Sequence, residues 1–102
     1  AADAQDDLTK AFVSTYQEKY GDIPNQFAAD AYDAVYTIKA VIEAANATPD
    51  MSVSELGTAL SGAMTQISVD GLTGEGMTWQ ESGEVSKAPK AVVIKDGAYT
   101  AM

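Results

Sequence analysis

The predicted helix start at residues 25–36 combines a capping side chain with an aromatic ring. Asn25 follows Pro24 and is a favoured N-cap, because its side-chain oxygen can accept hydrogen bonds from the free N–H groups of the first turn. Phe27 stands in that turn, where the backbone donors and the positive end of the helix dipole point. Such a helix start can hold a carboxylate and an apolar side chain together. The same pattern also describes an ordinary capped helix end.

The composition excludes several kinds of reactive site. The chain contains no Cys and no His, so disulfides, thiol nucleophiles, histidine bases and the usual zinc ligand sets are absent. No Ser stands in a nucleophile-elbow pattern. We therefore predict a protein that is not an enzyme, with no catalytic residues, no metal site and no cofactor.

Two further patterns suggest chemistry but have simpler explanations. Asp6 and Asp7 are adjacent carboxylates that fit the solvated first turn of a helix. The Gly-rich stretch 69–76 lacks the Gly-Lys-Ser/Thr of a phosphate loop and the alternating Asp/Asn of a calcium loop. We interpret it as an irregular loop that leads into a short strand.

Charge and length limit the partners of the chain. The formal net charge of −9 argues against nucleic acid and against anionic membrane surfaces. No run of 18 apolar residues is present, so no segment is predicted to span a membrane. The 102 residues fit one domain or less. Because no initiator Met or signal peptide opens the chain, we expect a segment of a longer sequence.

Three predicted amphipathic helices position these side chains. The first covers residues 6–20 and ends at Gly21, with an apolar face of Leu8, Phe12, Val13, Tyr16 and Tyr20. The second covers residues 26–46, with apolar positions 27, 28, 31, 35, 38, 42 and 45. The third begins at a capping box formed by Ser52 and Glu55 and continues through Ile67.

The second helix has a polar face and two tyrosines that need an explanation. We place Asp33, Lys39 and Glu43 on the polar face, where Lys39 and Glu43 form an i,i+4 pair of opposite charge. Tyr32 and Tyr36 lie at the edge of the apolar face and could stack on a sugar or a base. We favour packing between helices for both.

After residue 68 the pattern changes to short strands. Residues 77–79 form a predicted strand, 84–89 a polar connector, and 91–94 with 98–102 a hairpin around the strong turn signal Asp96-Gly97. The run from Val92 to Ile94 is typical of a strand buried on both faces of a larger sheet. We therefore predict an α/β unit of three helices, a short strand and a hairpin, and we expect this whole unit to be part of a larger fold.

Several motifs carry a family resemblance. In order they are Phe12…Tyr16…Lys19-Tyr-Gly21, Pro24…Phe27-Ala-Ala-Asp-Ala-Tyr-Asp-Ala34, Asp70-Gly-Leu-Thr-Gly74, Trp79…Ser82-Gly83-Glu-Val85…Lys87 and Val92-Val-Ile-Lys-Asp-Gly97. This order resembles the C-terminal third of the branched-chain amino-acid binding proteins of ABC transporters, which are type I periplasmic-type solute-binding proteins. The resemblance covers nearly all of the chain and implies a C-terminal fragment of the type I periplasmic-binding-protein fold.

The resemblance also implies how the chain is divided. Proteins of this family have two α/β lobes that close over a small ligand, and their polypeptide crosses between the lobes three times. By analogy, residues 1–83 belong to one lobe, 84–90 form the last inter-lobe crossing, and 91–102 form a hairpin on the other lobe.

The implied function is the extracytoplasmic solute-binding component of an ABC importer. Its ligand would be leucine or another branched-chain or related amino acid, its partners would be the permease subunits, and it would be secreted or lipid-anchored. The family pocket includes an aromatic residue at the position of Phe27, and Ala28 and Asp30 beside it are further candidates for ligand contact. In proteins of this family, most pocket residues lie in the first two-thirds of the sequence, outside the part that this chain resembles.

The sequence also allows a second function and predicts self-association. The alternative function is a ligand-binding sensory or protein-interaction domain on the same fold, which a transmembrane helix in the full gene would favour, whereas a secretory or lipoprotein signal would favour a transporter. Exposed apolar helix faces and unpaired strand edges also lead us to expect a homo-oligomer of the isolated chain.

Overall fold

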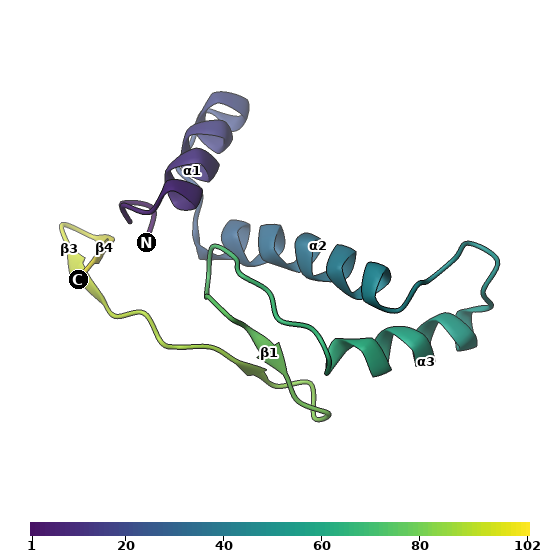
Figure 1. Ribbon diagram of the computed structural model, residues 1–102. Helices are drawn as coiled ribbons and strands as arrows, with labels where there is room; N and C mark the ends of the chain where they lie inside the picture. Colours follow the sequence, from purple (N-terminus) through teal and green to yellow (C-terminus); the bar gives the residue numbers. More distant parts are fainter.

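The computed structural model describes residues 1–102 as three helices and two small antiparallel sheets (Figure 1). The helices are α1 (Asp7–Tyr20), α2 (Gln26–Ala44) and α3 (Val53–Met64). The strands are β1 (Thr78–Trp79), β2 (Val85–Ser86), β3 (Val92–Lys95) and β4 (Ala98–Ala101). The predicted order of three helices, a short strand and a hairpin is confirmed, although α3 ends three residues before Ile67.

Local capping signals fix the helix ends. Asp6 is the N-cap of α1 and accepts a hydrogen bond from the Thr9 N–H at 2.9 Å. Gly21 ends α1 with a φ of 73°, a left-handed conformation that glycine adopts at little cost. At α3 the Ser52 hydroxyl accepts from the Glu55 N–H at 3.2 Å, and the Glu55 carboxylate accepts from the Ser52 N–H at 2.8 Å. The predicted capping box is therefore confirmed.

We predict that acid weakens the starts of α1 and α3. The Thr9 N–H holds the pKa of Asp6 below its ordinary 3.8, and the Ser52 N–H holds that of Glu55 below 4.5. A lowered folded-state pKa gives stability that is present above the unfolded value and is lost as pH falls through the folded value. Helix content measured by circular dichroism should therefore fall below about pH 4.5.

The matched variant is the double substitution Asp6→Asn with Glu55→Gln. Both new side chains keep a capping acceptor but do not titrate in this range. The variant should retain its helix content in acid better than the parent chain, and equal losses in the two proteins would show that other groups control the acid response.

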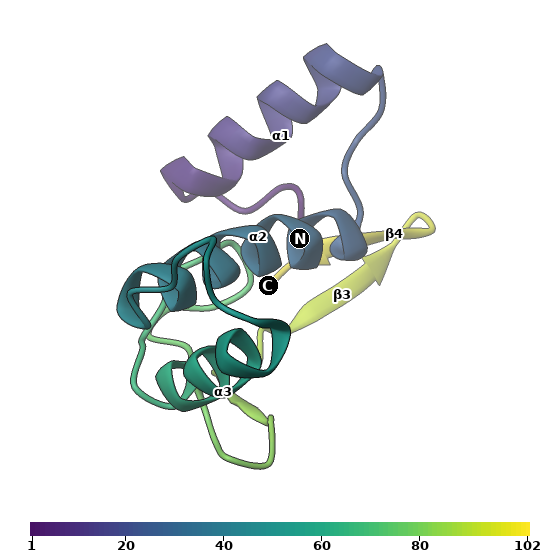
Figure 2. The ribbon, with the colours of Figure 1, turned by 90° about the vertical axis from the view of Figure 1, so that its right-hand side faces the viewer.

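The helices pack around α2. Figure 2 shows α1 on one side of α2 and α3 on the other. Between α1 and α2 the rings of Phe12 and Tyr32 lie 5.0 Å apart, centroid to centroid, which confirms the interhelical role predicted for Tyr32. Tyr36 contacts Tyr32 along the same helix at 4.8 Å and is about half exposed. The radius of gyration is 16.1 Å, against about 13 Å for a compact chain of this length.

The first sheet corrects one sequence-based expectation. β1 and β2 pair antiparallel, with Thr78 opposite Ser86 and Trp79 opposite Val85, and Met77 forms a bridge to Val69. Val85 and Ser86 are therefore strand residues, although we expected them in a polar connector. Two residues of mixed polarity give no strand pattern in the sequence, and only the partner β1 identifies them. Unpaired extended backbone begins after Ser86 and reaches to β3.

The second sheet is the predicted hairpin. β3 and β4 pair antiparallel, and Lys95 and Ala98 flank the two-residue turn. Asp96 and Gly97 have φ values of 51° and 79°, as a type I′ turn requires. The carboxylate of Asp3 accepts a hydrogen bond from the Ala101 N–H at 3.1 Å, so the hairpin lies beside the N-terminal residues. The two sheets remain separate.

The buried core is small. Only 9 of the 102 residues are buried, and the apolar ones are Val41, Val69, Leu72 and Met77. Three of these four belong to the Gly-rich segment 69–77, so the core lies where this segment contacts α2. As expected from the sequence, apolar side chains of α2 such as Phe27, Val35, Ile38 and Ile42 remain exposed.

Candidate functional site

The start of α2 exposes an aromatic side chain beside a capped helix end. Pro24 is buried, and Asn25 has extended backbone that turns its side chain onto the Ala28 N–H, with a distance of 3.0 Å. Phe27 is 76% exposed. Because the cap occupies the Ala28 donor, the free first-turn donors are those of Gln26 and Phe27. An apolar ring and free N–H groups therefore lie together at one accessible point.

The structure places the three predicted site residues on the first turns of α2. Phe27 is exposed, whereas Ala28 and Asp30 are half-buried. Asp30 follows Phe27 by three residues, so the two side chains neighbour each other along the helix surface. This arrangement offers an apolar surface, backbone donors and a carboxylate within one turn. These are the groups that a small zwitterion would need.

The most tightly built cluster in the molecule centres on Asp33. Its side chain is only 6% exposed and accepts three hydrogen bonds from a loop 40 residues away. One oxygen accepts from the Leu72 N–H at 2.8 Å, and the other accepts from the Thr73 N–H at 2.8 Å and the Thr73 hydroxyl at 2.7 Å. Bonds to a charged acceptor are about twice as strong as neutral ones. We call the segment 70–76 together with Asp33 the carboxylate clamp.

The prediction that Asp33 lies on the polar face of the helix is wrong, because its side chain is buried. Lys39 and Glu43 do form the predicted exposed ion pair at 3.1 Å. Asp33 instead aligns at spacings of four with Thr37 and Val41, and all three are buried. This spacing, together with a Gly-rich loop rich in free N–H groups, is the signal that could have identified the clamp.

Glycines allow the loop to approach Asp33. A Cβ built on Gly71 would lie 2.5 Å from the nearer Asp33 carboxylate oxygen, and one on Gly74 would lie 2.9 Å from Met77. Any side chain at Gly71 would therefore displace the carboxylate. The Gly-rich stretch is an irregular loop before a strand, as predicted, and close packing requires two of its glycines, Gly71 and Gly74.

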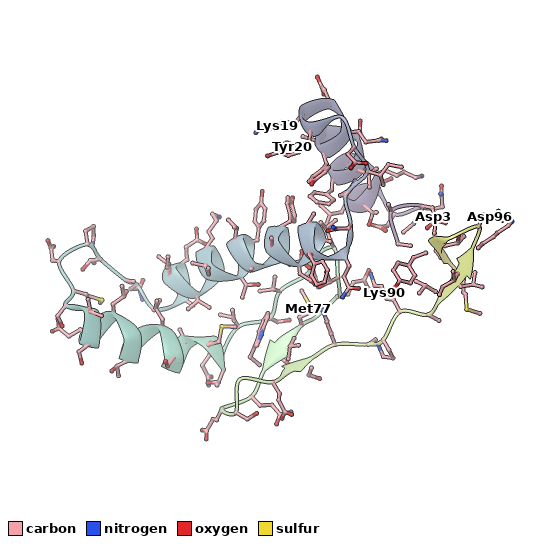
Figure 3. The ribbon with its side chains drawn as sticks, turned by 180° about the vertical axis from the view of Figure 1, so that it is seen from behind. Asp3, Lys19, Tyr20, Met77, Lys90 and Asp96 are labelled. Carbon is pink, nitrogen blue, oxygen red and sulfur yellow. The ribbon has the colours of Figure 1, made fainter.

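Two lysines join the clamp to the extended backbone that leads to the hairpin. The Lys87 ammonium donates to the Thr73 hydroxyl at 3.0 Å, and the Lys90 ammonium donates to the Leu72 carbonyl at 3.1 Å. In the view of Figure 3, Lys90 and Met77 both lie below α2. The direction in which the chain leaves β2 is therefore tied to the residues that Asp33 holds.

Two grooves of the surface lie away from the start of α2. One of about 330 Å³ lies against α1 and Tyr32, and one of about 290 Å³ lies between α2 and α3. Neither is lined by Phe27, Ala28 or Asp30. The start of α2 therefore contributes to neither groove.

None of the three helices combines the length and apolar character that crossing a membrane requires.

Two solved structures resemble the chain over its whole length. The structure matches an ABC transporter substrate-binding protein from Desulfitobacterium hafniense with a TM-score of 0.75 and 20% identity, over 100% of this chain and 29% of that one. It matches a protein assigned as a branched-chain amino acid ABC transporter from Rhodospirillum rubrum with a TM-score of 0.71 and 29% identity, over 100% of this chain and 28% of that one. A search of curated proteins found no match.

The first of these likenesses shows the fold, and the chain spans less than a third of the length of either protein. The expected α/β class, a part of the periplasmic-binding-protein fold, is therefore confirmed. A family model described as periplasmic binding protein matches residues 1–98, which is nearly the whole chain. The chain belongs to the periplasmic binding protein family.

Proposed function

We propose that these residues form part of the solute-binding component of an ABC importer that acts outside the cytoplasm. Membership of the periplasmic binding protein family supports the solute-binding role. The observation that carries the proposal is the exposed Phe27 beside free N–H groups at the capped start of α2. In this role the protein is not an enzyme, and its partners are a small solute and permease subunits.

We further propose a branched-chain or related amino acid, leucine among them, as the solute. The likeness to the Rhodospirillum rubrum protein supports this class. The free N–H groups of Gln26 and Phe27 would donate hydrogen bonds to the ligand carboxylate, assisted by the helix dipole. Phe27 would cover the apolar side chain, the small Ala28 would leave room, and Asp30 would attract the ammonium group.

The division into lobes is part of the same proposal. Residues 1–83 would belong to one lobe and 91–102 to the other, with an inter-lobe crossing at 84–90. The separation of the two sheets supports this division. Because β2 lies inside the crossing, the part that rotates would lie after β2, and the side-chain bonds of Lys87 and Lys90 to the clamp would limit where rotation can start.

Calorimetry with leucine, isoleucine and valine tests the function. This chain alone should bind them weakly or not at all, because one wall cannot bury the 70–90% of a ligand surface that good sites bury. A polypeptide that carries these residues within a complete binding-protein fold should bind at least one of them. Failure of that polypeptide to bind any amino acid would refute the proposed ligand class. Micromolar binding by this chain alone would refute the partial site.

We predict that Phe27→Ala in the complete fold weakens ligand binding by about 1–3 kcal/mol, because apolar contact and pocket shape are lost. Val53→Ala is the matched control, since Val53 is an equally accessible apolar side chain in the first turn of α3. The control should bind normally. Equal affinity of both variants, with unchanged stability, would remove Phe27 from the site.

A further inference from the structure

The chain contains two Asp-Gly sequences, Asp70-Gly71 and Asp96-Gly97. At such a sequence the glycine nitrogen can attack the side-chain carboxyl carbon of the aspartate. The five-membered ring forms readily because glycine has no side chain to shield its nitrogen. The reaction requires that both the carboxyl group and the following N–H be free to rotate into contact.

The first Asp-Gly sequence is held in place within the carboxylate clamp. The Asp70 carboxylate accepts a hydrogen bond from the Gly76 N–H at 2.6 Å, and the Gly71 N–H donates to the Gly74 carbonyl at 2.8 Å. Gly71 also lies against the buried carboxylate of Asp33. Both reacting groups of Asp70-Gly71 are therefore occupied, and rotation of the peptide unit would break the loop.

The second Asp-Gly sequence lies in the open. Both residues are exposed, and Figure 3 shows Asp96 at the outer end of the β3–β4 hairpin. A Cβ built on Gly97 would meet no atom within 4 Å. A single two-stranded hairpin is marginally stable and opens often, so the turn samples many backbone angles.

We propose that Asp96-Gly97 is a site of spontaneous aspartyl isomerisation. The Gly97 nitrogen forms a bond to the Asp96 side-chain carboxyl carbon, and the carboxyl hydroxyl group and the amide proton leave together as one water molecule. Water then adds to either carbonyl of the succinimide ring and restores aspartate or leaves isoaspartate. No oxidant or other reagent is consumed, and the product contains the chemical group that protein isoaspartyl methyltransferases modify.

Isomerisation would change the hairpin itself. In isoaspartate the main chain runs through the side-chain carboxyl group of residue 96. This adds one methylene group to the main chain between residue 96 and Gly97. The two-residue type I′ turn sets the register that pairs Lys95 with Ala98. A longer main chain cannot keep this turn, so pairing of β3 with β4 should weaken after modification.

The test is to age the folded chain at neutral pH and physiological temperature and to map isoaspartate by methyltransferase labelling and mass spectrometry. Trypsin cuts after Lys95 and releases residues 96–102, which should resolve into two species of equal mass. Residues 70–71 should convert at least about ten times more slowly, corresponding to about 1.4 kcal/mol of extra opening cost. Asp96→Asn keeps the turn, passes through the same succinimide and serves as the positive control.

Ageing in concentrated urea removes the structural protection. There, both Asp-Gly sequences should convert at similar rates, which would show that the folded loop causes the difference. Similar rates at the two sites in the folded chain would overturn the proposal. So would the absence of isoaspartate at Asp96 while the Asp96→Asn control and the urea sample convert.

Discussion

Asp33→Ala is expected to lower the free energy of unfolding of this chain by about 3–5 kcal/mol. The substitution removes the acceptor of three hydrogen bonds and leaves buried donors on Leu72 and Thr73 without a partner. It also opens space under α2, beside the few buried apolar side chains. Because small domains are stable by only about 5–15 kcal/mol, this one change removes a large part of the total.

Urea unfolding followed by circular dichroism measures the effect of Asp33→Ala. Asp30→Ala is the matched control, since it removes the same side chain from the same helix at a half-buried position. The control should cost well under 1 kcal/mol, as most surface substitutions do. Thr73→Val removes only the hydroxyl and should cost about 1 kcal/mol. Equal losses for Asp33→Ala and Asp30→Ala would contradict the clamp.

Signals that act within a few residues could be predicted from the sequence. The caps at Asn25 and Ser52, the stop at Gly21 and the turn at Asp96-Gly97 all occur as expected. Each depends on a side chain or a glycine within four residues of the backbone group that it serves. The sequence is therefore sufficient for the order of the helices and the hairpin and for most of their boundaries.

Long-range pairing could not be predicted in the same way. The spacing of Asp33 with Thr37 and Val41 can mark it as buried, but this spacing does not identify Leu72 and Thr73 as its partners. β2 has two residues, and only pairing with β1 makes it a strand. The candidate site has the same limit, because Phe27 can be placed at a helix start whereas the groups that would face it across a ligand lie outside the matched part of the family fold.

Self-association is the second large effect that we expect. The chain exposes 7403 Å², about 1,900 Å² more than a compact monomer of its mass. A specific protein interface of standard size buries about 1,600 Å² in total, so the excess area is large enough for one. Much of it is apolar, because Val35, Ile38 and Ile42 of α2 are 66%, 56% and 41% exposed.

The balance of forces favours association of this chain with a second copy. Each large apolar side chain contributes roughly 1.5–3 kcal/mol when it becomes fully buried. The net charge of −9 opposes contact, but salt screens this repulsion beyond about 8–10 Å. The groove between α2 and α3, lined in part by Ile38 and Met64, adds a concave surface to the same face. We therefore expect a dimer or higher oligomer at micromolar concentration.

Sedimentation of the parent chain and of two single variants tests this expectation. Val35→Lys places a charge on the exposed α2 face and should shift the chain toward monomer. Val53→Lys makes the same change at an 89% exposed side chain of α3 and is the control. Both variants reduce the net negative charge equally, so weaker association of Val35→Lys alone reports the apolar face. A folded parent monomer at all concentrations would show that the small core around Val41 and Met77 is sufficient and that the exposed face needs no second copy.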